Sequence, residues 1–262
     1  MNATARKPPA ALAAYVLHSW DWSESSLVVE LLTRERGRVV VVARGAKRPT
    51  SQLRPVLVPF QRLQVALGRS PADDSAEVHL LRCADRAEGP PMPAGSALFA
   101  GFYLNELLLK LLARDDAHEA LFDAYAHTLQ ALQAADEGGV QRALRAFELQ
   151  LLRELGVLPA LDTETLRVQP LDPQAGYTLH PESGVLRETS GSGVPGAALV
   201  AIEAALSAGD APALLAAVGA AMPALRAPLR QVLHYHLGTN RLRTRQVLAD
   251  VQRLIESEGP RP

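Results

Sequence analysis

The residues whose types and spacing point to a definite chemistry are basic ones in the first third of the chain. Between Arg34 and Arg69 the sequence has nine Lys or Arg residues and a single acidic residue, Glu35. An ordinary solvated surface mixes charges of both signs, whereas a patch of one positive sign binds a phosphate backbone without reading its sequence. We therefore predict that this stretch, the basic island, binds nucleic acid.

The basic island has two parts that we expect to contact phosphate groups. Arg34, Arg36 and Arg38 flank an expected hairpin turn at alternating positions, so an extended ladder would direct all three to one side of the sheet. The second part is a polar, proline-broken loop after the next strand, and its basic residues are Arg44, Lys47, Arg48 and Arg54. Together the two parts predict a positive groove on a small β-domain.

A second and smaller basic patch lies near the end of the chain. Five arginines and no acidic residue occur between residues 226 and 245, and three of them are further candidates for nucleic-acid contact: Arg241, Arg243 and Arg245. The alternative is that local ion pairs hold these residues at the N-terminal region of a helix. From Asp85 to Glu164 the balance is acidic, with 13 Asp or Glu against 6 Lys or Arg, so the net charge of −1 conceals opposed patches.

Two tryptophans, Trp20 and Trp22, precede the basic island. Exposed aromatic side chains stack on unpaired bases, at about 1–3 kcal/mol per base, but a tryptophan can equally fill the core of a small barrel. Strand alternation places both side chains on one face of their strand, and the pattern does not tell which face is inward. Base stacking and core packing therefore both remain open.

No catalytic signature accompanies the basic residues. The sequence contains no phosphate-binding P-loop, no HExxH zinc motif, no nucleophile elbow and no dinucleotide fingerprint. His234 and His236 are two residues apart on an expected helix and do not share a face, and Cys83 is the single cysteine, too few for a zinc cluster. We expect no enzyme, no metal and no cofactor. The alternative is a hydrolase or transferase assembled from scattered residues such as His18, His79 and Asp85.

Short β-strands must position the basic island. From Ala13 to about Arg82, five apolar and β-branched runs alternate with clusters of Gly, Pro, Ser and Asp, a pattern typical of strands. The four consecutive valines Val39 to Val42 disfavour a helix. Five short strands with one long loop favour a closed barrel such as the OB-fold over an open sheet with exposed edges.

A Pro/Gly linker at Glu88–Gly95 ends the barrel, and the apolar period then becomes helical. Three helices are expected first, at residues 98–112, 121–132 and 144–155. Gly138 and Gly139 are expected to divide the second helix from the third. Gly156 and Pro159 are expected to end the third.

The rest of the chain is expected to add a small β-hairpin and further helices. The hairpin has its turn at Pro181–Gly184. The later helices are expected at residues 198–207, 211–220, 224–237 and 244–257. The predicted class is therefore α+β, with an N-terminal OB-fold β-barrel at residues 1–87 and an α-helical bundle domain at residues 88–262 that carries the hairpin as an insert.

Four segments also resemble a known family. They are EsslvveLlTReRGrvvvvARGAKrptS at Glu24–Ser51, FYLNELLLKLL at Phe102–Leu112, FELQLLRELGVLP at Phe147–Pro159 and LRQVLHYHLGTNRLRTRQVL at Leu229–Leu248. In order and spacing they are similar to the RecO recombination mediator proteins, over nearly the whole chain. Many members carry a four-cysteine zinc module after the position of Pro159, whereas the matching insert here, about residues 160–196, has no cysteine. The chain resembles a zinc-free branch.

The resemblance implies a DNA repair and recombination mediator that binds and anneals single- and double-stranded DNA. It also implies three protein partners: RecR, the C-terminal tail of single-stranded DNA-binding protein, and indirectly the RecA recombinase. Carried over by motif position, the phosphate contacts would be Arg34, Arg38, Arg44, Lys47 and Arg48. An acidic tail needs a positive anchor on the helical domain, and the candidates are Arg114, Arg142 and Arg145.

The absence of a secretory signal and of about 18 successive apolar residues leads us to expect a cytoplasmic, nucleoid-associated protein with no membrane segment. Two alternatives to the mediator remain. One is an RNA-binding OB-fold protein, because phosphate contacts scarcely distinguish RNA from DNA. The other is a protein–protein adaptor, without catalytic activity, whose barrel binds acidic proteins.

Overall fold

The computed structural model describes residues 11–68, 78–134, 136–189, 191, 193–239, 241–244 and 246–247. The chain divides into two compact units. The first comprises the described residues up to Met92 together with Leu112–Asp123, and the second comprises Pro93–Leu111 with the described residues from Ala124 onward. Each unit has buried apolar residues of its own and is described by itself.

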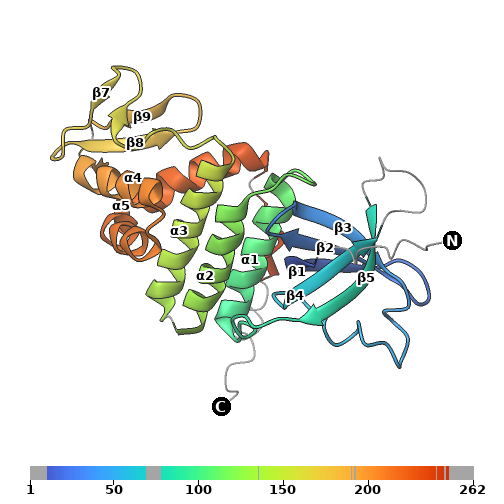
Figure 1. Ribbon diagram of the computed structural model, residues 1–262. Helices are drawn as coiled ribbons and strands as arrows, with labels where there is room; N and C mark the ends of the chain where they lie inside the picture. Colours follow the sequence, from blue (N-terminus) through green and yellow to red (C-terminus); the bar gives the residue numbers. More distant parts are fainter. Residues whose placement is uncertain are drawn as a thin grey trace, which may run out of the picture. The chain divides into compact units, whose positions relative to one another are not determined.

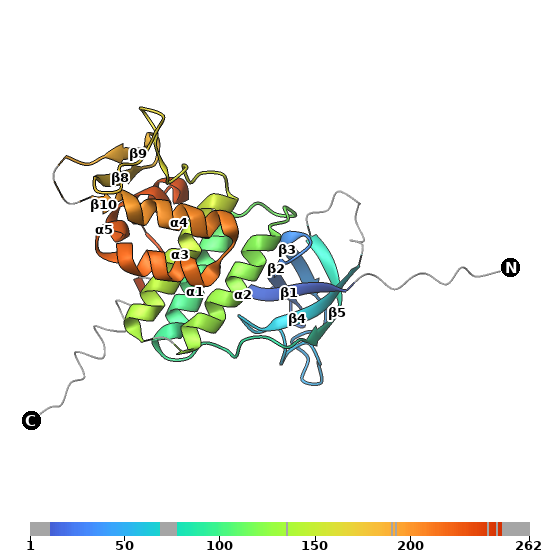
Figure 2. The same ribbon diagram turned by 60° about the vertical axis from the view of Figure 1, so that its left-hand side comes forward.

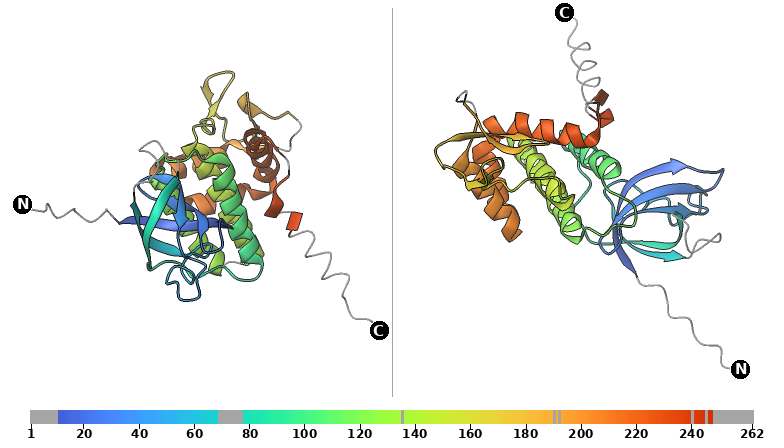
Figure 3. Two further views of the ribbon diagram at one scale, coloured as in Figure 1. Left: turned by 90° about the vertical axis from the view of Figure 1, so that its right-hand side faces the viewer. Right: turned by 90° about the horizontal axis from the view of Figure 1, so that it is seen from above.

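Five strands close the first unit into a barrel (Figures 1 and 3). They are β1 (Leu12–Asp21), β2 (Leu27–Thr33), β3 (Gly37–Ala43), β4 (Arg62–Gly68) and β5 (Val78–Arg86). Neighbours follow the order β1-β2-β3-β5-β4, with β3 and β5 parallel and the other pairs antiparallel. The predicted five-stranded barrel of the OB type is confirmed, and its closure pairs each strand on both edges.

Alternation along the strands fills the interior of the barrel. In β3, Val39 and Val41 belong to the buried interior cluster, together with Val29 and Leu31 of the neighbouring β2. Full burial of such a side chain contributes about 1.5–3 kcal/mol. The valine run therefore forms a strand and not a helix, as predicted, and its intervening residues such as Val42 point to the outer side.

A β-bulge in β1 decides the orientation of the tryptophan side chain in that strand. Val16 pairs with Leu31 and lies in the interior cluster, but the register then shifts by one residue, and His18 pairs with Glu30. Residues after the bulge therefore point to the opposite side of the strand from the side that unbroken alternation would give them. Trp20 lies on the outer side with 44% of its surface exposed, and its ring packs edge-on against His18 with centroids 4.4 Å apart.

The segment Leu112–Asp123 packs on the barrel within the first unit. Gly37 has a φ of +64°, and a Cβ atom there would lie 1.6 Å from the carbonyl oxygen of Asp116, so only glycine allows this approach. The Asp115 N–H donates to the carbonyl of Arg38 at 2.8 Å. The ring of Phe122 lies 5.2 Å from that of Tyr15, between centroids. Backbone and aromatic contacts thus fix the segment beside the turn between β2 and β3.

Five helices form most of the second unit in the residues that the structure describes. They are α1 (Ser96–Leu111), α2 (Glu119–Ala134), whose residues from Ala124 belong to this unit, α3 (Glu137–Glu154), α4 (Gly196–Ala208) and α5 (Ala211–Leu237). The prediction that Gly138 and Gly139 separate two helices is wrong, because both lie in the first turn of α3. Asp136 caps that helix by accepting a hydrogen bond from the Gly139 N–H at 2.7 Å. Gly156, with a φ of +70°, follows the end of α3 as expected.

The predicted break between residues 220 and 224 is also wrong, because α5 runs unbroken through Pro223 and Pro228. A proline inside a helix costs about 3 kcal/mol, but Val218, Leu225 and Leu229 are fully buried on one stripe of α5. At about 1.5–3 kcal/mol each, their burial outweighs either proline. By length and composition alone α5 could cross a membrane. Its buried residues lie along one stripe, and the helix packs against α3 and α4.

Two small sheets also belong to the described part of the second unit. β6 (Thr163–Glu164) pairs with β7 (Gln169–Pro170), and β8 (Gly176–His180) lies between β9 (Gly184–Arg187) and β10 (Val194–Pro195). The hairpin predicted around Pro181–Gly184 is confirmed, and β8 contacts α5 (Figure 2). The helix expected at residues 244–257 falls mostly outside the described residues, of which 243–244 and 246–247 are helical.

Candidate nucleic-acid interface

The turn between β2 and β3, residues 34–36, carries the first predicted contact residues. The Arg34 guanidinium donates to both carboxylate oxygens of Asp123, at 3.2 and 3.0 Å, and also to Glu119. The hydrogen bond to Asp123, together with the negative charges of Asp123 and Glu119, raises the pKa of Arg34 above its usual value. Arg34 is therefore paired within the first unit.

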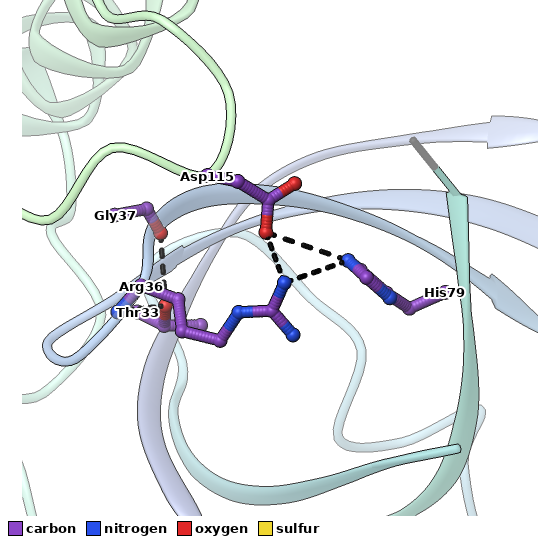
Figure 4. A network of polar contacts seen from close by, with 5 residues as sticks. All are labelled: Thr33, Arg36, Gly37, His79 and Asp115. Carbon is purple, nitrogen blue, oxygen red and sulfur yellow. Dashed lines mark hydrogen bonds and ion pairs between the residues drawn. The ribbon is translucent and has the colours of Figure 1, made fainter. Parts of the chain in front are cut away.

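Arg36 has an acidic partner as well. Its guanidinium pairs with Asp115, and its Nη2 lies 3.2 Å from Nε2 of His79, which is 3.4 Å from the same carboxylate (Figure 4). Thr33 braces the turn, because its hydroxyl donates to the Gly37 carbonyl at 2.9 Å and accepts from the Arg36 N–H at 3.2 Å. Both arginines of the turn thus contact the acidic segment Leu112–Asp123.

Arg38 lies apart from the turn, in β3. Only 15% of its side chain is exposed, and its Nε is 3.9 Å from the buried carboxylate of Glu30, which Arg114 approaches at 3.3 Å. The single open face expected for Arg34, Arg36 and Arg38 is not formed, because the first two lie in the turn and only the third lies on the ladder. The acidic run that holds the turn is visible in the sequence, but no spacing rule connects positions so far apart.

Lys47, another predicted contact, fastens the loop after β3 to the connection between β1 and β2. Its ammonium group donates to the Ser23 carbonyl at 3.1 Å and lies 3.0 Å from the carboxylate of Asp21. Its backbone N–H donates to the Ser25 carbonyl at 3.0 Å. Lys47 therefore holds two loops together, a role that sequence reasoning missed.

Three predicted contacts of the basic island remain open to solvent: Arg44, Arg48 and Arg54. In the part of the chain that the structure describes, none of them has an ion-pair partner. A tight turn follows Arg44, since Gly45 has a φ of +69° and its carbonyl accepts the Arg48 N–H at 3.1 Å. The turn places Arg44 and Arg48 at one end of β3.

Arg44 and Arg48 border a hollow of 390 Å³ on the outside of the barrel. It is lined by Trp22, Ser23, Ser25 and Ser26 of the β1–β2 connection, by Val42, Arg44, Gly45 and Arg48 at the end of β3, and by Val78, His79 and Leu80 of β5. None of these lining residues is acidic. OB barrels bind oligonucleotides on the face of strands 2 and 3 and with the loop between strands 1 and 2. We call this hollow the barrel hollow; it includes that loop and the end of β3, together with residues of β5.

The two tryptophans occupy different places. Trp20 lies in β1, whereas Trp22 follows the strand in the β1–β2 connection, with 68% of its surface exposed, and lines the barrel hollow. The expectation that both lie on one face of a strand is therefore wrong, because β1 ends at Asp21. Neither ring fills the barrel core.

The second basic patch is held by a carboxylate of α1. Glu106 accepts hydrogen bonds from the backbone N–H groups of Arg243 and Thr244, at 2.9 and 3.0 Å, and from the Thr244 hydroxyl at 2.7 Å. Burial alone would raise the pKa of Glu106, but the hydrogen bonds from Thr244, Arg243 and Lys110 outweigh it and hold the pKa below its usual value. Arg241 and Arg243 are exposed. Arg245 lies outside the described residues.

The three candidate anchors for an acidic tail are not equivalent. Arg114 belongs to the first unit and pairs with Glu30. Arg145 is 3% exposed, and its guanidinium lies 2.7 Å from the equally buried Glu148, so it does not offer a surface anchor. Arg142 has 45% of its side chain exposed and lies 3.8 Å from Asp136.

Arg142 borders a second, mainly apolar hollow of 530 Å³ in the helical unit. It is lined by Ala131 of α2, by Gly139, Arg142 and Ala143 of α3, and by Leu215, Ala216 and Gly219 of α5. We call it the helical hollow. It combines an apolar floor with one cation on its rim, the combination expected for an acidic and hydrophobic peptide.

A metal centre has no support in the residues that the structure describes, since no three His, Cys, Asp or Glu side chains gather there. His234 and His236 lie in the last turn of α5, and His236 packs edge-on against Tyr235 with centroids 5.2 Å apart. Burial lowers the pKa of His236.

Comparison with known proteins gives one consistent result. Residues 10–78 match the family model Recombination protein O N terminal, and residues 92–246 match Recombination protein O C terminal. The proteins named DNA repair protein RecO from Polaromonas sp. (strain JS666 / ATCC BAA-500) and Variovorax paradoxus (strain S110) are each 48% identical to this chain, over 246 and 263 residues. Each match covers 92% of this chain and 96% of the relative. The chain belongs to the RecO family of DNA repair proteins.

Proposed function

We propose that this chain is a recombination mediator that binds single- and double-stranded DNA through the barrel hollow and anneals complementary strands. The observation that carries the proposal is the position of two exposed arginines, Arg44 and Arg48, on the rim of a hollow that includes the β1–β2 loop and the end of β3 of an OB barrel. The relatives named DNA repair protein RecO support a function in DNA repair.

On the basis of the contacts described above, we assign different roles to the predicted DNA-binding residues. We assign direct phosphate contact to Arg44 and Arg48, with Arg54 beside them on the same loop. Arg34, Arg36, Arg38 and Lys47 would act indirectly, by holding the turn and the loop in place. Arg241, Arg243 and Arg245 would add a weaker contact in the helical unit.

The proposed mechanism makes and breaks no covalent bond. Basic groups that neutralise phosphates on two strands lower the repulsion that opposes pairing, and base pairing then supplies the free energy of annealing. Such a reaction consumes no nucleotide.

A second activity, capture of a protein tail, is favoured by the helical hollow. We propose that it receives the acidic, hydrophobic C-terminal tail of single-stranded DNA-binding protein, with Arg142 pairing with a carboxylate on its rim. Apolar side chains of the tail would replace water over Leu215 and Ala216. This contact would direct the protein to coated DNA, where it would act with RecR to help load RecA.

The proposed division of labour follows the predicted domains. The OB-fold at residues 1–87 would bind DNA, and the helical domain at residues 88–262 would bind protein, with the insert at about residues 160–196 in place of the zinc module of other members. A mediator of this kind would work in the cytoplasm, on the nucleoid.

Fluorescence anisotropy of labelled oligonucleotides across a salt series tests the central proposal. Each phosphate contact on a single strand contributes about −0.7 to the slope of log K against log salt. Three arginines therefore predict a slope of about −2 for wild type, together with accelerated annealing of complementary strands. A slope near zero, or no acceleration, would contradict the proposal.

The same titration separates the two alternatives. An RNA-binding protein would favour a matched RNA strand, because contacts to the 2′-OH distinguish the two polymers. An adaptor would bind an acidic protein more tightly than any oligonucleotide at equal salt. The proposal predicts that DNA binds at least as tightly as the RNA strand.

A further inference from the structure

Trp22 is exposed in a way that the barrel does not require. With 68% of its surface in water, its ring contributes little to the core, and the interior cluster does not include it. Single exposed hydrophobic residues are common, but this one lines a hollow that also carries two arginines without ion-pair partners among the described residues. The ring lines the same hollow as the side chains of Arg44 and Arg48. Together they suit a ligand that has both a flat apolar face and negative charge.

The connection that carries Trp22 is ordered by its own contacts. The backbone N–H of Trp22 donates to the Ser26 carbonyl at 3.2 Å, and the backbone N–H of Ser26 donates to the Ser23 hydroxyl at 3.2 Å. Lys47 adds the tethers to Ser23 and Ser25 described above. A ring presented from a fixed loop loses little conformational entropy when a ligand packs on it.

We infer that Trp22 stacks on an unpaired nucleobase whose flanking phosphates are held by Arg44 and Arg48. This inference rests on the proposed DNA site and names the form of DNA that the site prefers. A base inside a duplex already has both faces stacked on its neighbours, so it must leave the helix to reach an aromatic ring. The barrel hollow therefore favours single strands, gaps and frayed ends over intact duplex.

The chain offers a matched pair of variants, because Trp20 and Trp22 are its two tryptophans. Trp22→Ala should weaken binding of an oligo-dT strand about 5- to 100-fold, and should change the affinity for a blunt duplex less than about twofold. Trp20→Ala is the control, because its ring lies on the outer side of β1 and does not line the hollow. It should leave both affinities unchanged.

Fluorescence gives an independent readout in folded protein. In a Trp20→Phe variant, Trp22 is the sole indole, and oligo-dT should quench its emission, while in Trp22→Phe the emission of Trp20 should stay constant. Equal loss of single-strand and duplex binding in Trp22→Ala, or no quenching, would overturn the inference. The proposed DNA site would survive that result if Arg44→Ala still flattened the salt slope. If wild type binds no DNA, both fail.

Discussion

The guanidinium group of Arg34 donates to both carboxylate oxygens of Asp123, at 3.2 and 3.0 Å, across 89 positions of sequence. A bidentate pair of this kind fixes the direction of both side chains. It joins the turn after β2 to the first residues of α2 within the first unit. A residue that looks like a phosphate contact in the sequence is thus part of the scaffold that holds the turn.

We expect Arg34→Met to lower the melting temperature of the protein and to leave its DNA affinity within about twofold of wild type. Arg34 does not contact phosphate in this account, so its removal should change the salt slope by less than the value for one phosphate contact, about 0.7. Differential scanning fluorimetry and anisotropy titration measure the two quantities on the same preparation. Arg54→Met, at an exposed position on the loop after β3, is the matched control and should show the reverse pattern. A flattened slope of log K against log salt in Arg34→Met would show that Arg34 contacts DNA phosphate.

Glu106 predicts a pH dependence of stability. Its folded-state pKa lies below the ordinary value of 4.5, so ionised Glu106 stabilises the folded state fully above that value, and the stabilisation is lost as pH falls through the folded-state pKa. At neutral pH, Glu106→Gln should cost about 1–3 kcal/mol, because a charged acceptor of several hydrogen bonds is removed.

Urea unfolding from neutral pH down to about pH 3 checks this prediction, since the difference between Glu106→Gln and wild type should shrink as Glu106 of wild type becomes protonated. Glu88→Gln, in the exposed linker, is the control and should show no such trend. A difference that stays constant over the whole series would show that Glu106 acts through packing and not through its charge.

The helical hollow predicts a charge-dependent protein contact. Arg142→Glu should weaken binding of an acidic C-terminal tail peptide about tenfold, the loss expected for one charge-assisted hydrogen bond. Gly219→Leu should also weaken it, by filling the hollow beside Arg142. Calorimetric titration with the peptide measures both. Arg226→Glu changes the charge equally at an exposed position of α5 that does not line the hollow, and it should bind normally.

Arg145 and Glu148 form a buried pair that we expect to be structural. Tyr103 donates to Glu148 at 2.5 Å, and both charged side chains are at most 4% exposed. Arg145→Met alone should cost about 3–5 kcal/mol, because it leaves a buried carboxylate without its counter-charge. The double variant Arg145→Met with Glu148→Leu should recover most of that loss in urea unfolding. Loss of tail binding in the stable double variant would instead make Arg145 part of the partner site.

The barrel could be predicted from the sequence because its signals are local. The run Val39–Val42, the turn at residues 34–36 and the Pro/Gly linker each constrain a few neighbouring residues, and together they leave few architectures. One error has a local cause, since Asp136 caps α3 and places Gly138 inside its first turn. The other has a tertiary cause, since burial of one stripe of α5 outweighs the cost of Pro223 inside the helix.

The candidate site was less predictable, because its geometry depends on distant pairs. Charge counting found the basic island, but it could not show that Arg34 and Arg36 face Asp123 and Asp115 while Arg44 remains open. Alternation failed for the tryptophans because β1 ends at Asp21, so Trp22 lies in the connection after the strand. The face of Trp20 depends on the bulge earlier in β1, and no composition reveals a bulge.

The measurement that tests the account most directly compares two double variants in the same salt series with a single-stranded oligonucleotide. Arg44→Ala with Arg48→Ala should flatten the slope of log K against log salt by about 1.4, two contacts' worth, while Arg34→Ala with Arg36→Ala should keep the wild-type slope despite a lower melting temperature. The opposite result, an unchanged slope in the first variant and a flattened one in the second, would place the DNA site on the turn and contradict the assignment to the barrel hollow.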